Sequence, residues 1–265
     1  MEIDRDTFIT SDSYTTSSEQ KRALGDILSF GTSVYFGPKF LSLLNTSRKL
    51  ALANNFDTQT WAKTSMDIFR LIESCGGNFS IEGMENITKS SEPVVFISNH
   101  MSMLESMVFP GIIASRREVT FVVKKSLTTH KLFGPTMRAR KPIAVDRKDP
   151  IGDFKVVMAQ GEEKLKSGTS IVIFPQSQRM VQFDEKQFNT LGIKLAKKAG
   201  VKVIPVAIKT DFWTNGKIFK DISKLDRSKK IHIKFGEPIT IDGPGKKEHQ
   251  QVIDFIKGNL SIWNS

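Results

Sequence analysis

The stretch VVFISNHMSMLE, residues 94–105, holds the most informative pair of side chains in this chain. Residues 94–98 form an apolar run of the kind found in buried strands, and His100 and Glu105 follow it. Because an α-helix turns about 100° per residue, two side chains five positions apart, as His100 and Glu105 are, point in different directions on one helix. They can meet only if His100 lies in the turn before a helix and Glu105 lies in its first turns. The stretch therefore predicts a strand-to-helix corner, where α/β proteins place their ligands.

The carboxylate of this pair fits two roles. A histidine oriented by a carboxylate is a general base that can take a proton from a hydroxyl. The pattern Ser102-x-x-Glu105 is also that of a capping box, in which the glutamate only satisfies backbone N–H groups. The local sequence leaves both roles open.

Strand-like and helical patterns alternate through the rest of the chain. This alternation is typical of an α/β fold with a largely parallel central sheet flanked by helices, and here it carries an N-terminal helical extension. Gly200 is the expected C-cap of one helix. The predicted strands are Val94–Ser98, Val119–Lys124, Pro142–Asp146, Ser170–Phe174, Val201–Ile208 and Ile231–Phe235, and the predicted helices are Asp57–Glu73, Glu105–Ala114, Phe154–Lys166, Phe188–Lys198 and Lys247–Asn259.

Composition narrows the class of protein. A length of 265 residues suits one sizeable domain, and a hydrophobic content of 39% does not suit a polytopic membrane protein. The net charge of +11 favours partners that carry phosphate, such as anionic lipids, nucleic acid or nucleotide-bearing substrates. Cys75 is the only cysteine, so neither an intrachain disulfide nor a cysteine-based metal site can form.

The N-terminal part is predicted to differ from the rest. Residues 1–20 are acidic and then rich in serine and threonine, so we expect a flexible tail without a signal peptide. Residues 21–78 are expected to be helical, and their least polar window, 27–44, is too short and too interrupted to span a membrane. This window fits two short amphipathic helices hinged at Gly37-Pro38 and lying on a membrane, or a helical hairpin packed on the domain.

Three further polar clusters close predicted strands: KPIAVDR at 141–147, FPQSQR at 174–179 and VIPVA at 203–207. Taken singly, each fits a structural role, and the proline within the third marks an edge, a bulge or a bend. Together with NHMSMLE at 99–105, their order and spacing resemble the four motifs of the glycerolipid acyltransferase family, the 1-acylglycerol-3-phosphate acyltransferases and their relatives. The resemblance covers about Ile81 to Ile239.

The resemblance implies an acyltransferase domain over residues 79–265 that works at the cytoplasmic face of a membrane, as a peripheral or monotopic protein. Such an enzyme moves a fatty acyl group from acyl-CoA or acyl-carrier protein to the free hydroxyl of a lysophospholipid, here 1-acylglycerol-3-phosphate, in phospholipid biosynthesis. It holds no cofactor and no metal. The resemblance assigns His100 and Glu105 to general-base catalysis, and it assigns substrate binding to Lys124, Arg147, Gln176, Ser177 and Arg179.

The sequence departs from the family pattern at two motifs. Glu105 replaces the usual aspartate, and Gln176, Ser177 and Gln178 stand where glutamate, glycine and threonine are usual. Because the third motif helps to hold the acyl acceptor in this family, these changes leave the acceptor open. The alternatives are an acyltransferase with a different lysolipid acceptor and a lipid-binding relative with weak catalysis.

Other classes of protein are disfavoured. The basic clusters match no nucleic-acid-binding signature, so no nucleic-acid partner is expected. The chain has neither the Gly-x-Ser-x-Gly of serine hydrolases nor the Gly-rich phosphate loop of nucleotide hydrolases. The remaining histidines, His130, His232 and His249, are isolated, and no metal site is expected from them.

Overall fold

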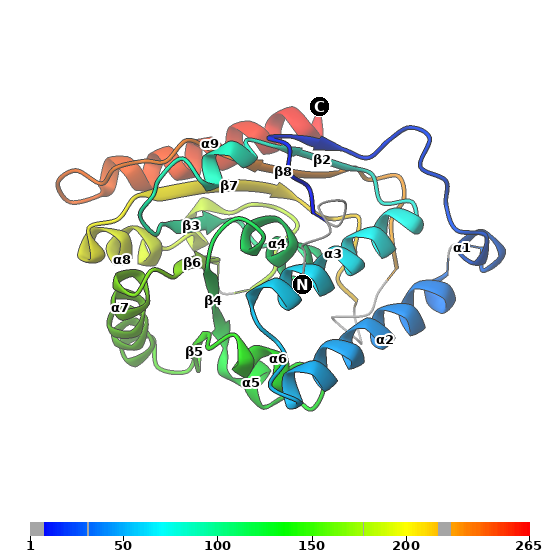
Figure 1. Cartoon of the computed structure of the whole chain (residues 1–265). Coiled ribbons are helices and arrows are strands. Elements are labelled where there is room, and N and C mark those ends of the chain that lie inside the picture. Colours follow the sequence, from blue (N-terminus) through cyan, green and yellow to red (C-terminus); the bar gives the residue numbers. More distant parts are fainter. Residues whose placement is uncertain (1–7, 31, 177, 217–223) are drawn as a thin grey trace.

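The computed structural model of the chain describes residues 8–30, 32–176, 178–216 and 224–265 (Figure 1). Within these residues an eight-stranded sheet runs in the order β1-β2-β8-β7-β3-β6-β4-β5. Its parallel part consists of β3 (Val95–Ser98), β4 (Val119–Lys124), β5 (Ile143–Val145), β6 (Ser170–Ile173) and β7 (Val203–Lys209). On the other side of β7, β8 (Ile231–Phe235) runs antiparallel to it, β2 (Phe79–Glu82) pairs in parallel with β8, and β1 (Tyr14–Thr15) runs antiparallel to β2.

Helices flank this sheet (Figure 1). On one side α7 (Pro150–Lys166), α8 (Leu191–Ala199) and α9 (Lys246–Asn264) pack against the strands. On the other side α2 (Ser33–Leu52), α3 (Thr58–Ser74), α4 (Leu104–Phe109), α5 (Lys125–Thr129) and α6 (Gly134–Ala139) pack on one another. The predicted fold class, α/β with a mostly parallel sheet, is therefore confirmed.

The local sequence explains where these elements begin and end. The central strands are apolar except at single end positions because helices cover both faces, and every residue of β3, β6 and β7 is buried. The carboxylate of Asp57 accepts a hydrogen bond from the N–H of Thr60 and starts α3. Gly200 ends α8 in the left-handed conformation, at a φ of 69°, as predicted.

One predicted helix is divided in the structure. The expected helix over Glu105–Ala114 is an α-helix only to Phe109 and continues as a π-helical turn over Pro110–Ala114. Proline has no N–H to donate and its ring clashes with the preceding turn, so the widened turn begins at Pro110. The segment stays buried throughout this π-helical turn, which packs on α3.

Pro205 lies inside β7, between two other strands, and the sheet adapts to it with a bulge. Val203 pairs with Ile239 and Val206 pairs with Phe235, so three steps along β7 face four steps of the chain that continues from the end of β8. The carbonyl of Pro205 accepts the N–H of Gly236 within this irregular stretch. Of the roles that a proline indicates inside a strand, the structure shows the bulge.

The N-terminal part corrects two expectations. Residues 8–20 are not a free tail, because Tyr14 and Thr15 pair with Ile81 and Ser80 and because Ile9 is buried; residues 1–7 lie outside the described residues. The predicted hinge at Gly37-Pro38 is wrong, since α2 runs through both residues.

The break in this region falls earlier, between α1 (Leu24–Leu28) and α2. Helix α2 tolerates the proline because its inner face, formed by Phe36, Phe40 and Leu44, is buried in the core. No helix in the described part of the chain is long and apolar enough to cross a membrane.

Candidate active site

The end of β3 is fixed to β7 before the site begins. The side-chain amide of Asn99 exchanges two hydrogen bonds with the backbone of Ile208, both 2.9 Å long. This amide continues the sheet pairing for one more residue, so the chain leaves β3 at a defined point. His100 lies in the turn that follows, and α4 starts at Leu104, which places Glu105 in the first helical turn.

The two side chains meet, as their spacing predicts. Nδ1 of His100 lies 2.8 Å from Oε1 of Glu105. The same oxygen accepts the backbone N–H groups of Met101 at 2.7 Å and of Ser102 at 2.9 Å. Glu105 therefore caps its own turn, as in a capping box, and contacts the imidazole at the same time. The two roles that the sequence left open share one oxygen atom.

The second carboxylate oxygen is bound by two hydroxyls. Oε2 of Glu105 accepts Ser102 Oγ at 3.0 Å and Thr210 Oγ1 at 2.7 Å. Burial by itself raises the pKa of the Glu105 carboxyl, but the hydrogen bond from His100, the charge of the protonated imidazole and the hydroxyl of Thr210 hold that pKa below its ordinary value.

The ionised carboxylate decides which imidazole nitrogen carries the proton. A carboxylate only accepts hydrogen bonds, so the hydrogen between the two groups belongs to Nδ1 of His100. Nε2 then has a free lone pair. This is the tautomer that a general base needs.

Residues of the third predicted motif contact both the ring and the backbone of His100. The imidazole stacks on Phe174 with ring centroids 4.3 Å apart and 22° between the planes. The backbone N–H of His100 donates to Oε1 of Gln176 at 2.8 Å, and its carbonyl accepts the N–H of Met180 at 2.8 Å. Gln176 is buried, and its amide nitrogen has no hydrogen-bond partner among the described residues.

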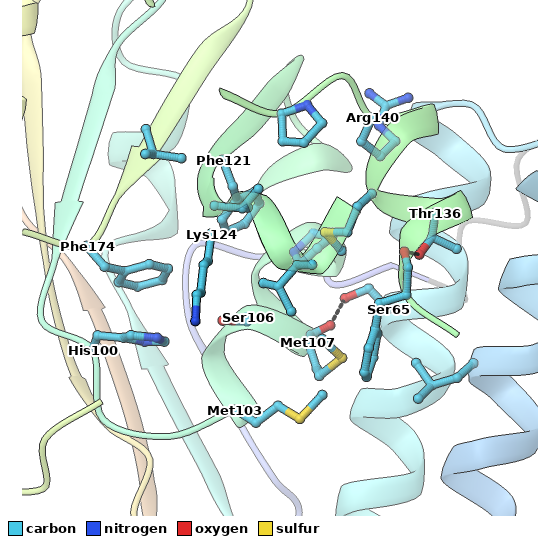
Figure 2. A pocket seen from close by; sticks show the side chains of 18 of the residues that line it. Ser65, His100, Met103, Ser106, Met107, Phe121, Lys124, Thr136, Arg140 and Phe174 are labelled. Carbon is cyan, nitrogen blue, oxygen red and sulfur yellow. Dashed lines mark hydrogen bonds between the residues drawn. The ribbon is translucent and has the colours of Figure 1, made fainter. Parts of the chain in front are cut away.

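A cavity of about 460 Å³ opens beside the imidazole and extends between β4 and the helices α2 to α6. Figure 2 shows His100 at one end, with the Lys124 side chain reaching toward the same end, and Arg140 and Thr136 at the other. Most of the wall between them is apolar. Its apolar side chains include Leu44, Phe56, Trp61, Ile68, Met103, Met107, Phe121, Leu127, Phe133, Met137 and Phe174.

The structure gathers most of the predicted site residues around this cavity. His100, Lys124, Arg147 and Arg179 line it. Arg147 sits in a tight turn with a φ of 62°, and the carboxylate of Asp153 accepts its backbone N–H. Predicted residues outside the lining are Glu105, which lies behind the imidazole, Gln176, which contacts the backbone of His100, and Ser177, which lies outside the described residues.

Two features of the site were not predicted from the sequence. Thr210 follows β7 directly and contacts Glu105, although it lies beyond the fourth motif. A polar residue at the carboxyl end of a parallel strand is the signal that could have revealed it. The cavity wall was also missed, because it is assembled from helices far apart in the sequence.

Comparison with known proteins supports the resemblance. Residues 78–209 match the sequence model of a family described as Acyltransferase. A 1-acyl-sn-glycerol-3-phosphate acyltransferase of Pseudomonas aeruginosa is 32% identical over 152 residues, which make up 57% of this chain and 56% of that protein. A chloroplastic 1-acyl-sn-glycerol-3-phosphate acyltransferase of Arabidopsis thaliana is 26% identical over 155 residues, 58% of this chain and 40% of that protein. The chain thus spans about half the length of these relatives.

A solved structure shares the fold. The crystal structure of the 1-acyl-sn-glycerophosphate (LPA) acyltransferase PlsC from Thermotoga maritima superposes with a TM-score of 0.63 at 20% sequence identity. The match covers 88% of this chain and 90% of the Thermotoga chain. At this identity the match concerns the architecture.

Proposed function

We propose that the protein acylates the free hydroxyl of a lysophospholipid in phospholipid biosynthesis. The premise is that residues 78–209 of this chain match the acyltransferase family. The acceptor proposed first is 1-acylglycerol-3-phosphate, the acceptor in the names of its relatives. The donor is a fatty acyl thioester, acyl-CoA or acyl-carrier protein, and the protein itself needs no bound cofactor.

The contact between His100 and Glu105 at the end of an apolar cavity carries this proposal. Nε2 of His100 takes the proton of the acceptor hydroxyl while the hydroxyl oxygen attacks the thioester carbonyl. The C–O bond forms and the C–S bond breaks, and the imidazolium returns its proton to the leaving sulfur. Glu105 stabilises the imidazolium that exists between the two proton transfers.

Three cationic residues of the cavity lining suit the phosphate of the acceptor. Lys124, Arg147 and Arg179 all line the cavity together with His100. Guanidinium groups bind phosphate through two parallel hydrogen bonds, and an ammonium binds it as a point charge. We assign the acceptor phosphate to these three side chains, with Arg179 as the principal ligand.

The apolar part of the cavity suits a fatty acyl chain. Its volume of about 460 Å³ lies within the range of ligand pockets, about 300–1,000 Å³. Met103, Met107 and Met137 contribute flexible thioether side chains to the wall, which adapt to ligands of different shape.

A group of exposed apolar side chains on α1, on the start of α2 and at Phe30 between them suits a membrane surface. Leu24 and Leu28 are both 77% exposed, Phe30 is 94% exposed and Val34 is 73% exposed. Exposed apolar groups of this size on neighbouring segments mark interaction sites, and a basic protein is attracted to anionic lipid. We propose peripheral or monotopic association with the cytoplasmic face of a membrane through this surface, called here the α1–α2 apolar surface.

The third motif gives a reason to test other acceptors. The buried amide of Gln176 replaces a carboxylate at the position that supports the backbone of His100. A neutral amide both donates and accepts hydrogen bonds, so the acceptor headgroup near this motif can differ from that of the relatives. A lipid-binding relative with weak catalysis is the second candidate, for the same reason.

One experiment separates these possibilities. The purified full chain is incubated with acyl-CoA or acyl-carrier protein and a panel of lysophospholipids that differ in headgroup, and the products are identified by mass. A product from one lysophospholipid supports acyl transfer and names the acceptor. Lysophospholipid binding without any product supports the lipid-binding relative.

A further inference from the structure

Thr210 lies immediately after β7 and beyond the four motifs, and its side chain is fully buried. Its hydroxyl donates to Oε2 of Glu105 at 2.7 Å. This is the length of a charge-assisted bond between a hydroxyl and a carboxylate, which is roughly twice as strong as a neutral hydrogen bond. Glu105 is itself fully buried, so its orientation depends on such partners.

The bond from Thr210 differs from every other bond to this carboxylate in the described part of the chain. The other donors are the imidazole of His100, the backbone of Met101, and the backbone and hydroxyl of Ser102. They all belong to the turn that Glu105 closes, so they would move with it. Thr210 comes from the end of β7 and ties the carboxylate to the sheet.

The segment that carries Thr210 holds the turn at a second place. The N–H of Thr210 donates to Sδ of Met101 at 3.2 Å, and the amide of Asn215 donates to the carbonyl of Met101 at 2.8 Å. The residue between His100 and Ser102 is thus held through both its backbone and its side chain. These contacts fix the turn relative to the strand end.

The same segment is packed against the N-terminal part of the chain. Trp213 is 1% exposed and contacts Phe36 and Phe40 of α2 edge to face, with ring centroids 4.9 and 5.0 Å away. Such aromatic contacts restrain the ring in position and angle. Thr210 is therefore presented from a segment that cannot shift without disturbing the core.

We infer that Thr210 is a positioning residue for the pair formed by His100 and Glu105. Its hydroxyl fixes the plane of the Glu105 carboxylate, and this plane sets the direction in which the imidazole presents Nε2 to the cavity. Thr210 acts through Glu105 and does not touch the substrate. The predicted change in kcat rests on the proposed function. The hydrogen bonds of Thr210 exist whatever reaction the protein catalyses.

The main test replaces Thr210 by valine, which has nearly the same shape and no hydroxyl. Loss of one hydrogen bond to a charged group predicts a kcat about 10- to 150-fold lower for Thr210→Val. The KM values of donor and acceptor should change little, because neither substrate contacts Thr210. Thr210→Ser retains the hydroxyl and should recover most of the lost kcat.

The chain offers a matched control. Thr16 Oγ1 donates to the buried carboxylate of Glu73, also at 2.7 Å, on the far part of the sheet where β1 pairs with β2. Thr16→Val removes the same type of bond away from the cavity, so it should lower the melting temperature and leave kcat unchanged. If Thr210→Val does not fold, Thr210→Ala and Thr210→Ser isolate the hydroxyl, since both lack the methyl group.

A double-mutant cycle tests whether Thr210 acts through Glu105. In a Glu105→Ala background, Thr210→Val should have little further effect on kcat, because the side-chain group that it orients is gone. Equal kcat for wild type and Thr210→Val would overturn the inference. So would a loss of kcat that Thr210→Ser fails to recover.

The inference is also testable if the proposed function fails. The nitrogen chemical shifts of the His100 ring report which nitrogen carries the proton. Wild type should show the hydrogen on Nδ1, and Thr210→Val should show a mixture of both tautomers. Identical shifts in the two proteins would overturn the positioning role, whereas wild type without turnover on any lysolipid would overturn the proposed reaction alone.

Discussion

Oε1 of Glu105 lies 2.8 Å from Nδ1 of His100, although the two residues could not face each other on one helix. The contact exists because the helix starts at Leu104, so the turn before it brings the imidazole back over the first helical turn. The same carboxylate accepts the N–H groups of Met101 and Ser102. The extra methylene of a glutamate at this position is therefore accommodated, and Oε1 accepts hydrogen bonds from the imidazole and from two backbone N–H groups.

Glu105→Gln should lower kcat by roughly 100-fold or more, as loss of general-base support does. The amide oxygen can take the place of Oε1, and the amide nitrogen can face the hydroxyls of Ser102 and Thr210, which can turn to accept. The shape survives, but the charge that stabilises the imidazolium is lost. Glu105→Asp keeps this charge and should retain more activity than Glu105→Gln. Steady-state kinetics test the order, and the reverse order would show that reach matters more than charge.

The stability of the fold should depend on the ionisation of Glu105. Its pKa is lower in the folded protein than in the unfolded chain, where the pKa of a glutamate is about 4.3. The stabilisation is therefore fully present above that pH and is lost as the pH falls through the lower, folded-state pKa. The difference in unfolding free energy between wild type and Glu105→Gln should be largest near neutral pH and should shrink in acid. Denaturant unfolding over this range measures it, and a difference that grows in acid would contradict the assignment.

Arg179→Ala should raise the KM for a phosphate-bearing lysolipid by roughly 10- to 150-fold, the cost of losing a hydrogen bond to a charged group. Arg179→Lys should recover part of the loss, because an ammonium lacks the planar fork. Arg147→Ala should act in the same direction if it shares the phosphate. Arg138→Ala is the control, since Arg138 is exposed on α6 and is not part of the cavity lining. If only the KM of the donor changes, Arg179 belongs to the donor side.

Membrane binding should depend on the α1–α2 apolar surface. Removal of residues 1–45 would also remove Phe36 and Phe40, which pack on Trp213, so truncation would disturb the site. Replacement of Leu24, Leu28, Phe30 and Val34 by serine is the cleaner change. It should shift the protein from liposomes to the supernatant, and added salt should weaken the binding that remains.

Ile262→Ser is the control for this shift, because Ile262 is 69% exposed on α9. Equal sedimentation of the quadruple variant and wild type would assign the α1–α2 apolar surface to another role. An equal shift with Ile262→Ser would show that any exposed apolar group suffices.

The sequence predicts the parallel core because these strands are apolar on both faces and alternate with amphipathic helices. It also predicts the corner between His100 and Glu105, since their spacing permits contact in only one arrangement. It does not predict β1, a strand of two residues that exists only through its pairing with β2. The path of α2 through Pro38 likewise depends on tertiary burial of Phe36 and Phe40.

The contact of Thr210 and the cavity also depend on tertiary packing, so local sequence patterns do not predict them. The hydroxyl of Thr210 meets Glu105 across 105 positions of sequence, and the cavity wall joins α2 and α3 to β4 and α6. Such features arise when elements pack, so no period or motif within one element records them. The third motif is an intermediate case, because the position of Gln176 was predicted while its contact with the backbone of His100 was not.

Turnover by wild type and by His100→Ala shows whether His100 is the catalytic base. Both proteins are assayed with acyl thioester and 1-acylglycerol-3-phosphate, with folding matched by circular dichroism and with His130→Ala, an exposed histidine outside the cavity lining, as the control. We expect acyl transfer by wild type and by His130→Ala, and a rate about 10²- to 10⁴-fold lower for His100→Ala, the range of general-base catalysis. Equal rates for wild type and a folded His100→Ala would contradict the assignment of His100 as the catalytic base.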